Sequence, residues 1–205
     1  MKNIELYNIE NIDNTLLIKE YNNLEQGISF LLKDYNENDI NEMSYIENIV
    51  FNFLEYHKKK IMLKSDDKFF AEFWVKKNTK EFGNNLHFDK DEDESIRNNK
   101  FIFPELASVL YLQDTTVPTI ITNISYEKYK YKDFNDSINY QMYFGKKNTQ
   151  IVFDPKYLHG SLLNDEFVNN IERPILAINI WKNHIPKNNI YYSPNTILEK
   201  KNIGN

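Results

Sequence analysis

The chain has 205 residues, a length that is typical of one domain and sufficient to bury a sizeable core. Hydrophobic residues make up 41% of the sequence and aromatic residues 15%, which excludes a chain that is disordered throughout. The sequence contains no cysteine, so disulfide scaffolds, thiol nucleophiles, iron–sulfur clusters and cysteine-ligated zinc are excluded. Any metal must therefore be bound by His, Asp or Glu. The net charge of −5, without a basic stripe, does not indicate a nucleic-acid partner.

The N-terminal residues lead into no apolar signal segment, and no run of about 18 apolar residues occurs in the sequence. These features predict a soluble, cytoplasmic protein that does not contact a membrane. Arginine is rare, because among 25 basic residues only Arg97 and Arg173 are arginine. Each arginine is therefore more informative in this chain than in one that uses both basic residues freely.

Residues 1–65 are predicted to be mainly helical and to support the rest of the domain. Between residues 13 and 35, apolar residues recur at spacings of three and four, which predicts an amphipathic helix. A second helix is predicted to begin near Ser44, because Ser44 and Glu47 have the spacing of a capping box. The three lysines at 58–60 favour the C-terminus of this helix.

From residue 66 the pattern changes to short runs rich in β-branched and aromatic residues, separated by turn residues. These runs predict an all-β barrel or jelly-roll sandwich with the N-terminal helices packed on its outside. We therefore expect a single, mainly β domain over residues 1–205, with a β core at 66–185 and a C-terminal tail at 186–205. The predicted strands are 69–75, 107–112, 119–124, 140–144, 150–153, 158–163 and 175–181.

The four histidines have different contexts. His57 is expected to be a half-exposed helix residue, and His184 is expected in a loop after a strand. In a strand, His87 and Asp89 share one face, so that an imidazole and a carboxylate converge. His159 ends an apolar run and is a candidate third ligand. Two His and one carboxylate make the facial triad that binds Fe(II), but a single His-x-Asp pair also arises by chance, so the triad is a hypothesis at this point.

Arg173 begins a predicted strand in which every second residue, including Asn179, shares one face. Two interpretations are open for Arg173: it lines a cavity, or it forms a surface salt bridge with Glu172. In a cavity, its guanidinium would bind a carboxylate through two parallel hydrogen bonds, which lysine cannot do. Asn179 is either a contact to a bound ligand or a satisfied interior amide.

Four segments of the sequence resemble the Fe(II)/2-oxoglutarate-dependent dioxygenases, specifically their prolyl hydroxylase-like branch. The resemblance covers about half the chain and implies a double-stranded β-helix over 66–185, a cupin-like jelly roll with helices packed on the larger sheet. The segments, in the order that the family has them, are Leu86–Glu92, Pro104–Gln113, Phe153–Gly160 and Arg173–Trp181.

The resemblance also implies roles for individual residues. It implies that His87, Asp89 and His159 bind the iron. It implies that Arg173 pairs with the distal carboxylate of 2-oxoglutarate and that Tyr111, in the Tyr-Leu segment that matches the family's, contacts the same carboxylate. Together with Asn179 as a further candidate, these residues form the predicted site for the co-substrate.

Two features depart from the family's pattern. Residues 116–119 read Thr-Val-Pro-Thr where the family often has Gly-Gly-x-Thr, and the long interval before Arg173 predicts an extended loop over 164–170. These departures leave the predicted ligands in place, but prolyl specificity does not transfer. The acidic run 89–94 is predicted to be a solvated loop, with attraction of a basic substrate as an alternative.

The predicted function is an Fe(II)- and 2-oxoglutarate-dependent oxygenase that uses O2 to hydroxylate a C–H bond of a protein side chain or small molecule, with succinate and CO2 as co-products. Two alternatives are a non-catalytic jelly-roll binding module and a cupin-like metalloenzyme that does not use 2-oxoglutarate. The joint presence of the three candidate metal ligands and Arg173 favours the oxygenase, because a binding module has no need of all four.

Overall fold

The computed structural model describes residues 4–35, 41–61, 64, 66–78, 86–134, 137–161, 172–187 and 190–192. The helices are α1 (Asn14–Asn23), α2 (Tyr45–Ile61), α3 (Glu92–Asn98) and α4 (Tyr126–Lys130). The strands are β1 (Glu5–Asn8), β2 (Phe30–Leu31), β3 (Phe69–Asn78), β4 (Leu106–Tyr111), β5 (Thr119–Ser125), β6 (Tyr140–Tyr143), β7 (Thr149–Phe153), β8 (Tyr157–Gly160), β9 (Glu172–Lys182) and β10 (Ile190–Tyr191). The predicted loop over 164–170 lies outside the described residues, as does most of the predicted tail.

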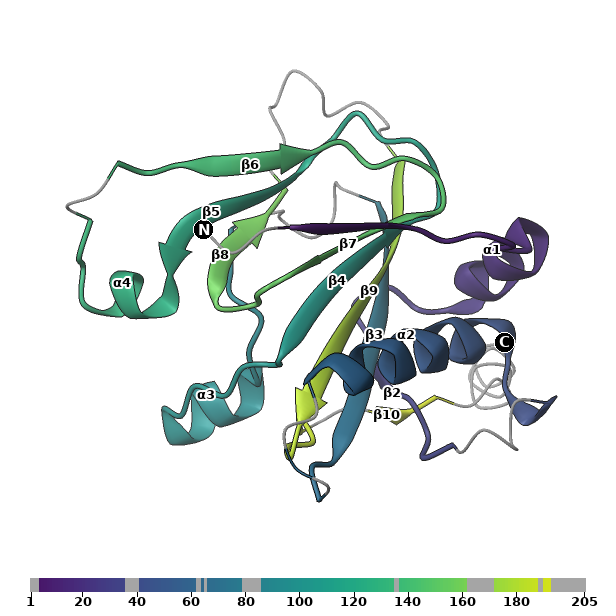
Figure 1. Ribbon diagram of the computed structural model, residues 1–205, viewed down its shortest axis with the longest axis horizontal. Helices are drawn as coiled ribbons and strands as arrows, with labels where there is room; N and C mark the ends of the chain where they lie inside the picture. The colour runs from purple at the N-terminus through teal and green to yellow at the C-terminus, as the bar shows by residue number, and fades with distance from the viewer. Residues whose placement is uncertain are drawn as a thin grey trace, which may run out of the picture.

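The strands form two sheets (Figure 1). The larger sheet has the order β1-β7-β4-β9-β3-β2-β10, and the smaller sheet has the order β6-β5-β8. Neighbouring strands are antiparallel except for β2 and β10. A cluster of buried side chains from β4, β5, β7 and β9 packs between the two sheets. The predicted mainly β, jelly-roll fold is therefore confirmed.

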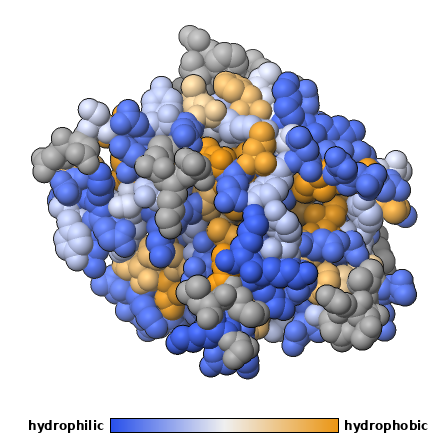
Figure 2. Space-filling view, in the orientation of Figure 1, coloured by the Kyte–Doolittle hydropathy of each residue, from blue (hydrophilic) through white to orange (hydrophobic). Residues whose placement is uncertain are grey.

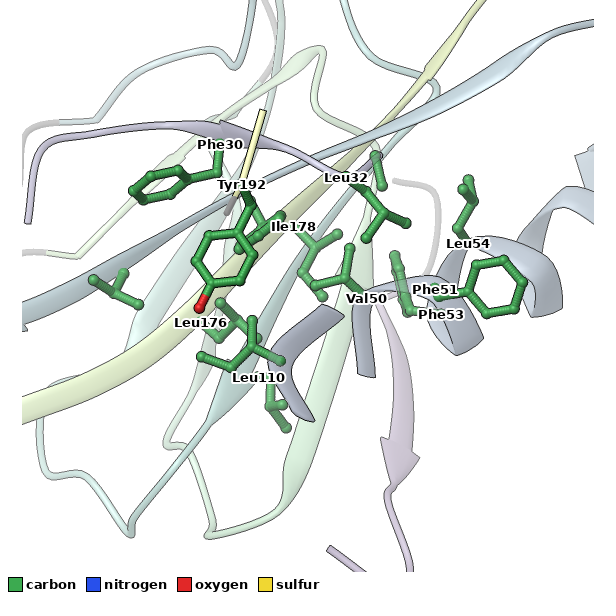
Figure 3. Close-up of a cluster of buried hydrophobic side chains, with 14 of the residues drawn as sticks. Phe30, Leu32, Val50, Phe51, Phe53, Leu54, Leu110, Leu176, Ile178 and Tyr192 are labelled. Atoms are coloured by element: carbon green, nitrogen blue, oxygen red, sulfur yellow. The ribbon is translucent and has the colours of Figure 1, made fainter. Parts of the chain in front are cut away.

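Helices α1 and α2 pack on the outer face of the larger sheet, as predicted for the N-terminal helices (Figure 1). Figure 3 shows the core of this layer, in which Val50 of α2 and Leu110 of β4 lie in one cluster with Leu176 and Ile178 of β9. Because side chains alternate along a strand, the intervening residues of β9 point to the opposite face, toward the smaller sheet. One strand thus contributes to the core on one side and to the interior of the jelly roll on the other.

Ser44 and Glu47 form the predicted capping box at the start of α2. The Ser44 hydroxyl accepts a hydrogen bond from the Glu47 N–H at 3.2 Å, and the Glu47 carboxylate accepts one from the Ser44 N–H at 2.9 Å. Tyr35 donates a further hydrogen bond to Glu47 at 2.8 Å, which helps to explain why this acidic side chain is buried. The three lysines at 58–60 lie in the last turn, as predicted.

The first helix is shorter than the predicted segment 13–35. Asp13 caps α1, but the chain becomes extended at Leu24 (φ −71°, ψ 140°). Gly27 has a positive φ of 86°, a conformation that a helix does not contain. The two residues of β2 then pair with β3 of the larger sheet. The apolar spacing that resembled a continuing helix therefore belongs to a short strand between β3 and β10, because burial against the sheet overrides local periodicity.

The second half of the acidic run, from Glu92, belongs to a helix instead of the predicted solvated loop. The Asp91 carboxylate caps α3 by accepting a hydrogen bond from the Glu94 N–H at 3.0 Å, and acidic residues fill the first turn, where the helix dipole favours them. Asn99 has a left-handed conformation and ends the helix. Strands β1, β2 and β10 and helix α4 were also not predicted, because segments of two to five residues are too short to show a period.

His57 is buried, with 2% of its surface exposed, which is contrary to the prediction of a half-exposed residue. The rings of Tyr7 and Tyr56 contact its imidazole edge-on. Burial, helped by the positive charge of Lys60 and opposed by Glu5, lowers the pKa of His57 to about 4. The sequence pattern of α2 could not show this, because β1 covers the helix from a distant part of the chain.

Within the described ranges, none of the helices has both the length and the apolar character needed to cross a bilayer. On the face shown in Figure 2, hydrophilic residues predominate and hydrophobic residues form separate patches between them.

Replacing Leu176 with Ala should lower the free energy of unfolding by about 2–5 kcal/mol, because the side chain is fully buried between α2 and the sheet. The matched change Leu16→Ala removes the same atoms from a residue that is 44% exposed, and it should change stability by less than about 0.5 kcal/mol. Urea unfolding followed by circular dichroism measures both values. Equal losses in the two variants would contradict this placement of the core.

The buried His57 should make stability depend on pH. Its folded pKa of about 4 lies below the ordinary 6.5, so protonation favours the unfolded chain. The stabilisation is fully present above pH 6.5 and is lost as the pH falls toward 4. Urea unfolding across this range should show a steeper loss for the wild type than for His57→Leu. Parallel pH profiles for the two proteins would show that His57 is not held neutral.

Candidate metal centre and carboxylate site

A cavity lies between the two sheets, and its lining residues come from both. Strands β3, β4, β7 and β9 contribute from the larger sheet, while β5, β8 and the segment before α3 contribute from the other side. The lining residues are Trp74, Lys76, His87, Asp89, Ser108, Val109, Thr119, Phe153, His159, Gly160, Ser161, Arg173, Ile175 and Ala177.

Backbone pairing brings His87 and His159 together. The His87 N–H donates to the His159 carbonyl at 2.8 Å, and the His159 N–H donates to the His87 carbonyl at 2.9 Å. This isolated antiparallel bridge joins the segment before α3 to β8. Residues that exchange both hydrogen bonds stand directly opposite each other, so their side chains project to the same side. The two imidazole centroids are 4.6 Å apart.

Asp89 completes the cluster that the sequence suggested. Its Oδ1 atom lies 3.4 Å from His87 Nε2 and 3.5 Å from His159 Nε2. One possible ligand atom from each residue lies within 4.8 Å of the others. Two imidazole nitrogens and one carboxylate oxygen are a donor set that suits Fe(II) and leaves further coordination positions open. The residues present therefore fit a transition metal of this kind.

The hydrogen bonds of the cluster favour metal binding. His159 Nδ1 lies 2.8 Å from the Tyr157 carbonyl, which only accepts, so Nδ1 donates to it and Nε2 is the nitrogen that faces Asp89. Burial alone would raise the pKa of Asp89, but the facing His159 and His87 outweigh this effect and hold it well below its usual range. Asp89 is therefore ionised, as a metal ligand must be.

Asp91 anchors the segment that holds Asp89. Besides capping α3, its carboxylate accepts hydrogen bonds from His184 Nε2 at 2.8 Å and from the Lys187 N–H at 3.3 Å. His184 lies in a loop, as predicted, directly after β9. The contact therefore ties the end of β9 to the residues that follow Asp89, which restrains the position of the Asp89 carboxylate.

Arg173 lies in the same cavity wall and is buried, with 4% of its surface exposed. Its Nη2 donates to Thr119 Oγ1 at 2.5 Å and its Nε donates to the Val117 carbonyl at 3.3 Å. The Tyr111 hydroxyl lies 2.5 Å from the same Thr119 oxygen, and the Arg173 guanidinium lies over the Tyr111 ring at 5.7 Å. Thr119 therefore connects Tyr111 to Arg173.

The charge of Arg173 has no acidic partner among the described residues. Its burial is contrary to the alternative of a surface salt bridge. Burial lowers the pKa of Arg173, with Tyr111 opposing the shift, and burial raises the pKa of Tyr111. Because a buried cation without a counter-charge is costly, this arrangement suits the binding of an anion.

Asn179 is the predicted site residue that the structure does not bring to the cavity. It is buried further along β9, outside the lining, and its Oδ1 atom has no hydrogen-bond partner within the described part of the chain. Tyr111 is also fully buried and outside the lining, but it reaches Arg173 through Thr119.

Sequence reasoning missed three residues of the site. Thr119 had a usable signal, because it ends the Thr-Val-Pro-Thr segment where the family's pattern also ends in Thr. Gly145 packs so closely on Tyr111 that an added Cβ would lie 2.0 Å from its ring, a constraint without a chemical signature in the sequence. Lys76 lines the cavity from β3, but the sequence does not distinguish it from the many other lysines of the chain.

Replacing Asp89 with Asn should weaken the binding of Co(II), a stable substitute for Fe(II), by more than about 100-fold. Loss of a residue that only hydrogen-bonds a metal ligand costs about 10- to 100-fold, and loss of a ligand itself should cost more. The matched change Asp93→Asn, four residues later, removes the charge that pairs with Arg97 in α3, outside the cavity lining, and should weaken binding by less than about fivefold. Calorimetric titration measures both. Similar affinities in the two variants would exclude Asp89 as a ligand.

Solved structures share this architecture. IDO from Bacillus thuringiensis has a TM-score of 0.55 at 18% identity, over 89% of this chain and 91% of that one. HygX from Streptomyces hygroscopicus has a TM-score of 0.50 both with iron bound and with nickel and 2-oxoglutarate bound. Identity is 9% and 8% respectively, over 93% of this chain and 84% and 85% of HygX.

No protein-family model matches the sequence, and the curated proteins contain no match to it. At 8% to 18% identity, the matches to solved structures show the fold alone. The protein has the jelly-roll fold of IDO and HygX, and the resemblance to 2-oxoglutarate-dependent dioxygenases is confirmed at the level of the fold.

Proposed function

We propose that this protein is an Fe(II)- and 2-oxoglutarate-dependent oxygenase that hydroxylates a C–H bond of a protein side chain or a small molecule. The observation that supports this most strongly is the presence, in one cavity, of a His-Asp-His cluster and a buried arginine without an acidic partner among the described residues. The first suits a transition metal and the second suits a carboxylate, which are the two groups that such a reaction requires.

In this proposal His87, Asp89 and His159 hold the iron. Their side chains project to the same side, because all three come from two backbone segments that pair with each other. The hydrogen bond from His159 Nδ1 to the Tyr157 carbonyl fixes the orientation of one ligand, and the contacts of Asp91 restrain the segment of another.

Arg173 binds the distal carboxylate of 2-oxoglutarate. HygX, which shares the fold, has been solved with nickel and 2-oxoglutarate bound, which supports this choice of co-substrate. The guanidinium offers parallel N–H donors that match the two carboxylate oxygens. Thr119 and Tyr111 hold Arg173 in place, and the Thr119 hydroxyl lines the cavity within reach of the same carboxylate.

When bound, iron and 2-oxoglutarate supply an oxidative reaction with O2 that yields succinate and CO2 and hydroxylates the substrate. The chain's own contribution is to position these groups and to keep water away from them. Val109, Phe153, Ile175 and Ala177 provide apolar walls beside the polar ligands.

The proposal is tested with the purified protein under anaerobic conditions. Addition of Fe(II) and 2-oxoglutarate should produce a visible metal-to-ligand charge-transfer band, because a 2-oxo acid bound through two oxygens absorbs in this way on iron. In air, the same mixture should form succinate when a pool of peptides and metabolites is added. A wild-type protein that gives no band would exclude the proposal and would favour a metal site that does not use 2-oxoglutarate.

Replacing Arg173 with Lys should weaken 2-oxoglutarate binding by about 10- to 100-fold, because the ammonium keeps the charge but loses a charged hydrogen bond worth about 1.5–3 kcal/mol. Arg97→Lys changes the only other arginine, which is exposed on α3, and should leave the affinity unchanged. Titration of the charge-transfer band gives both affinities. An unchanged affinity in Arg173→Lys would show that the paired N–H donors of the Arg173 guanidinium do not bind 2-oxoglutarate.

A further inference from the structure

Lys76 is a second cation in the proposed active site. It lies on β3 opposite Ile175 of β9, and both residues line the cavity, as do Trp74 and Ala177 one step along the same pair of strands. Its side chain is partly buried. In the described part of the structure, its ammonium group makes neither a hydrogen bond nor an ion pair, although its backbone carbonyl accepts a hydrogen bond from Tyr21.

The electrostatic surroundings of Lys76 include groups from both parts of the site, which line the same cavity. Burial lowers the pKa of Lys76, the positive charge of Arg173 lowers it further, and the negative charge of Asp89 raises it. Lys76 therefore interacts electrostatically with both Arg173 and Asp89, which line the same cavity.

The charges of the loaded site do not balance when Lys76 is included. The two positive charges of Fe(II) and the charge of Arg173 are offset by Asp89 and the two negative charges of 2-oxoglutarate. Asp89 is the only acidic side chain among the described lining residues, so the charge of Lys76 is left without compensation. An unpaired charge that is partly removed from solvent is costly, and an anionic group beside it removes that cost.

On the basis of the proposed function, we infer that the primary substrate carries a carboxylate and that Lys76 binds it. Lys76 is then a specificity-determining residue, and Trp74 beside it provides an apolar surface for the rest of the substrate. Arg173 binds the distal carboxylate of 2-oxoglutarate in the proposed function, which leaves Lys76 for the carboxylate of the primary substrate. The carboxylate belongs either to a free acid or to an acidic side chain of a peptide.

The test measures binding to the protein loaded with Fe(II) and 2-oxoglutarate under anaerobic conditions, so that it does not depend on turnover. The probes are pairs that differ only in charge: the common L-amino acids with their amides, and N-acetylated, C-amidated Asp and Glu with the corresponding Asn and Gln compounds. Calorimetric titration gives each affinity. The first set detects a free acid and the second set detects an acidic side chain.

At least one acid should bind the wild-type protein about 10- to 100-fold more tightly than its neutral partner, the range expected for a charged hydrogen bond. In Lys76→Met this preference should fall to less than about twofold, while Lys76→Arg should retain part of it. Lys77→Met is the matched control, because Lys77 points away from the cavity and donates to the Asn22 carbonyl. It should retain the full preference.

The inference is wrong if no acid is preferred over its neutral partner, or if the preference persists in Lys76→Met. It is also wrong if Lys76→Met weakens the binding of 2-oxoglutarate itself by more than about tenfold, because Lys76 would then serve the co-substrate. A wild-type protein that binds no 2-oxoglutarate would instead refute the proposed function, and with it this inference. The charge-transfer band separates that outcome from the others.

Discussion

The paired backbone hydrogen bonds between His87 and His159 are the constraint on which the rest of the site depends. They join two segments that are far apart in the chain and set their side chains opposite each other. Asp89 lies two residues after His87 on the same side of the backbone, so main-chain geometry alone brings the three side chains together. The contacts of Asp91 with His184 and α3 hold this arrangement from the other end.

The second constraint is the burial of positive charge on the inner face of the larger sheet. Arg173 and Lys76 face the cavity from neighbouring strands, where their desolvation costs free energy. The same strands bury apolar residues such as Leu176 and Ile178 against α2 on the outer face. This apolar burial offsets the desolvation cost of the two cations, for which the described residues provide no ion pair.

Most of the β core was predictable, because each strand from β3 to β9 is long enough or apolar enough to show its own pattern. Strands β2 and β10, at one end of the larger sheet, were not predictable, since they have two residues each and form through pairing with distant segments. The first helix was predicted too long for the same reason. Leu24, Ile28 and Leu31 continue a helical spacing in sequence, but the chain turns at Gly27 and joins the sheet at β2.

By itself, the sequence determined the residue types available for chemistry and their relation within a strand. His87 and Asp89 share a face because side chains alternate along extended backbone, and no distant residue is needed for that conclusion. Only the tertiary structure decided which strands meet: that His159 stands opposite His87, that Thr119 joins Tyr111 to Arg173, and that Asn179 lies outside the cavity. The physical reason is that side-chain direction follows local backbone geometry, whereas register between strands is set by hydrogen bonds and burial between segments remote in the chain.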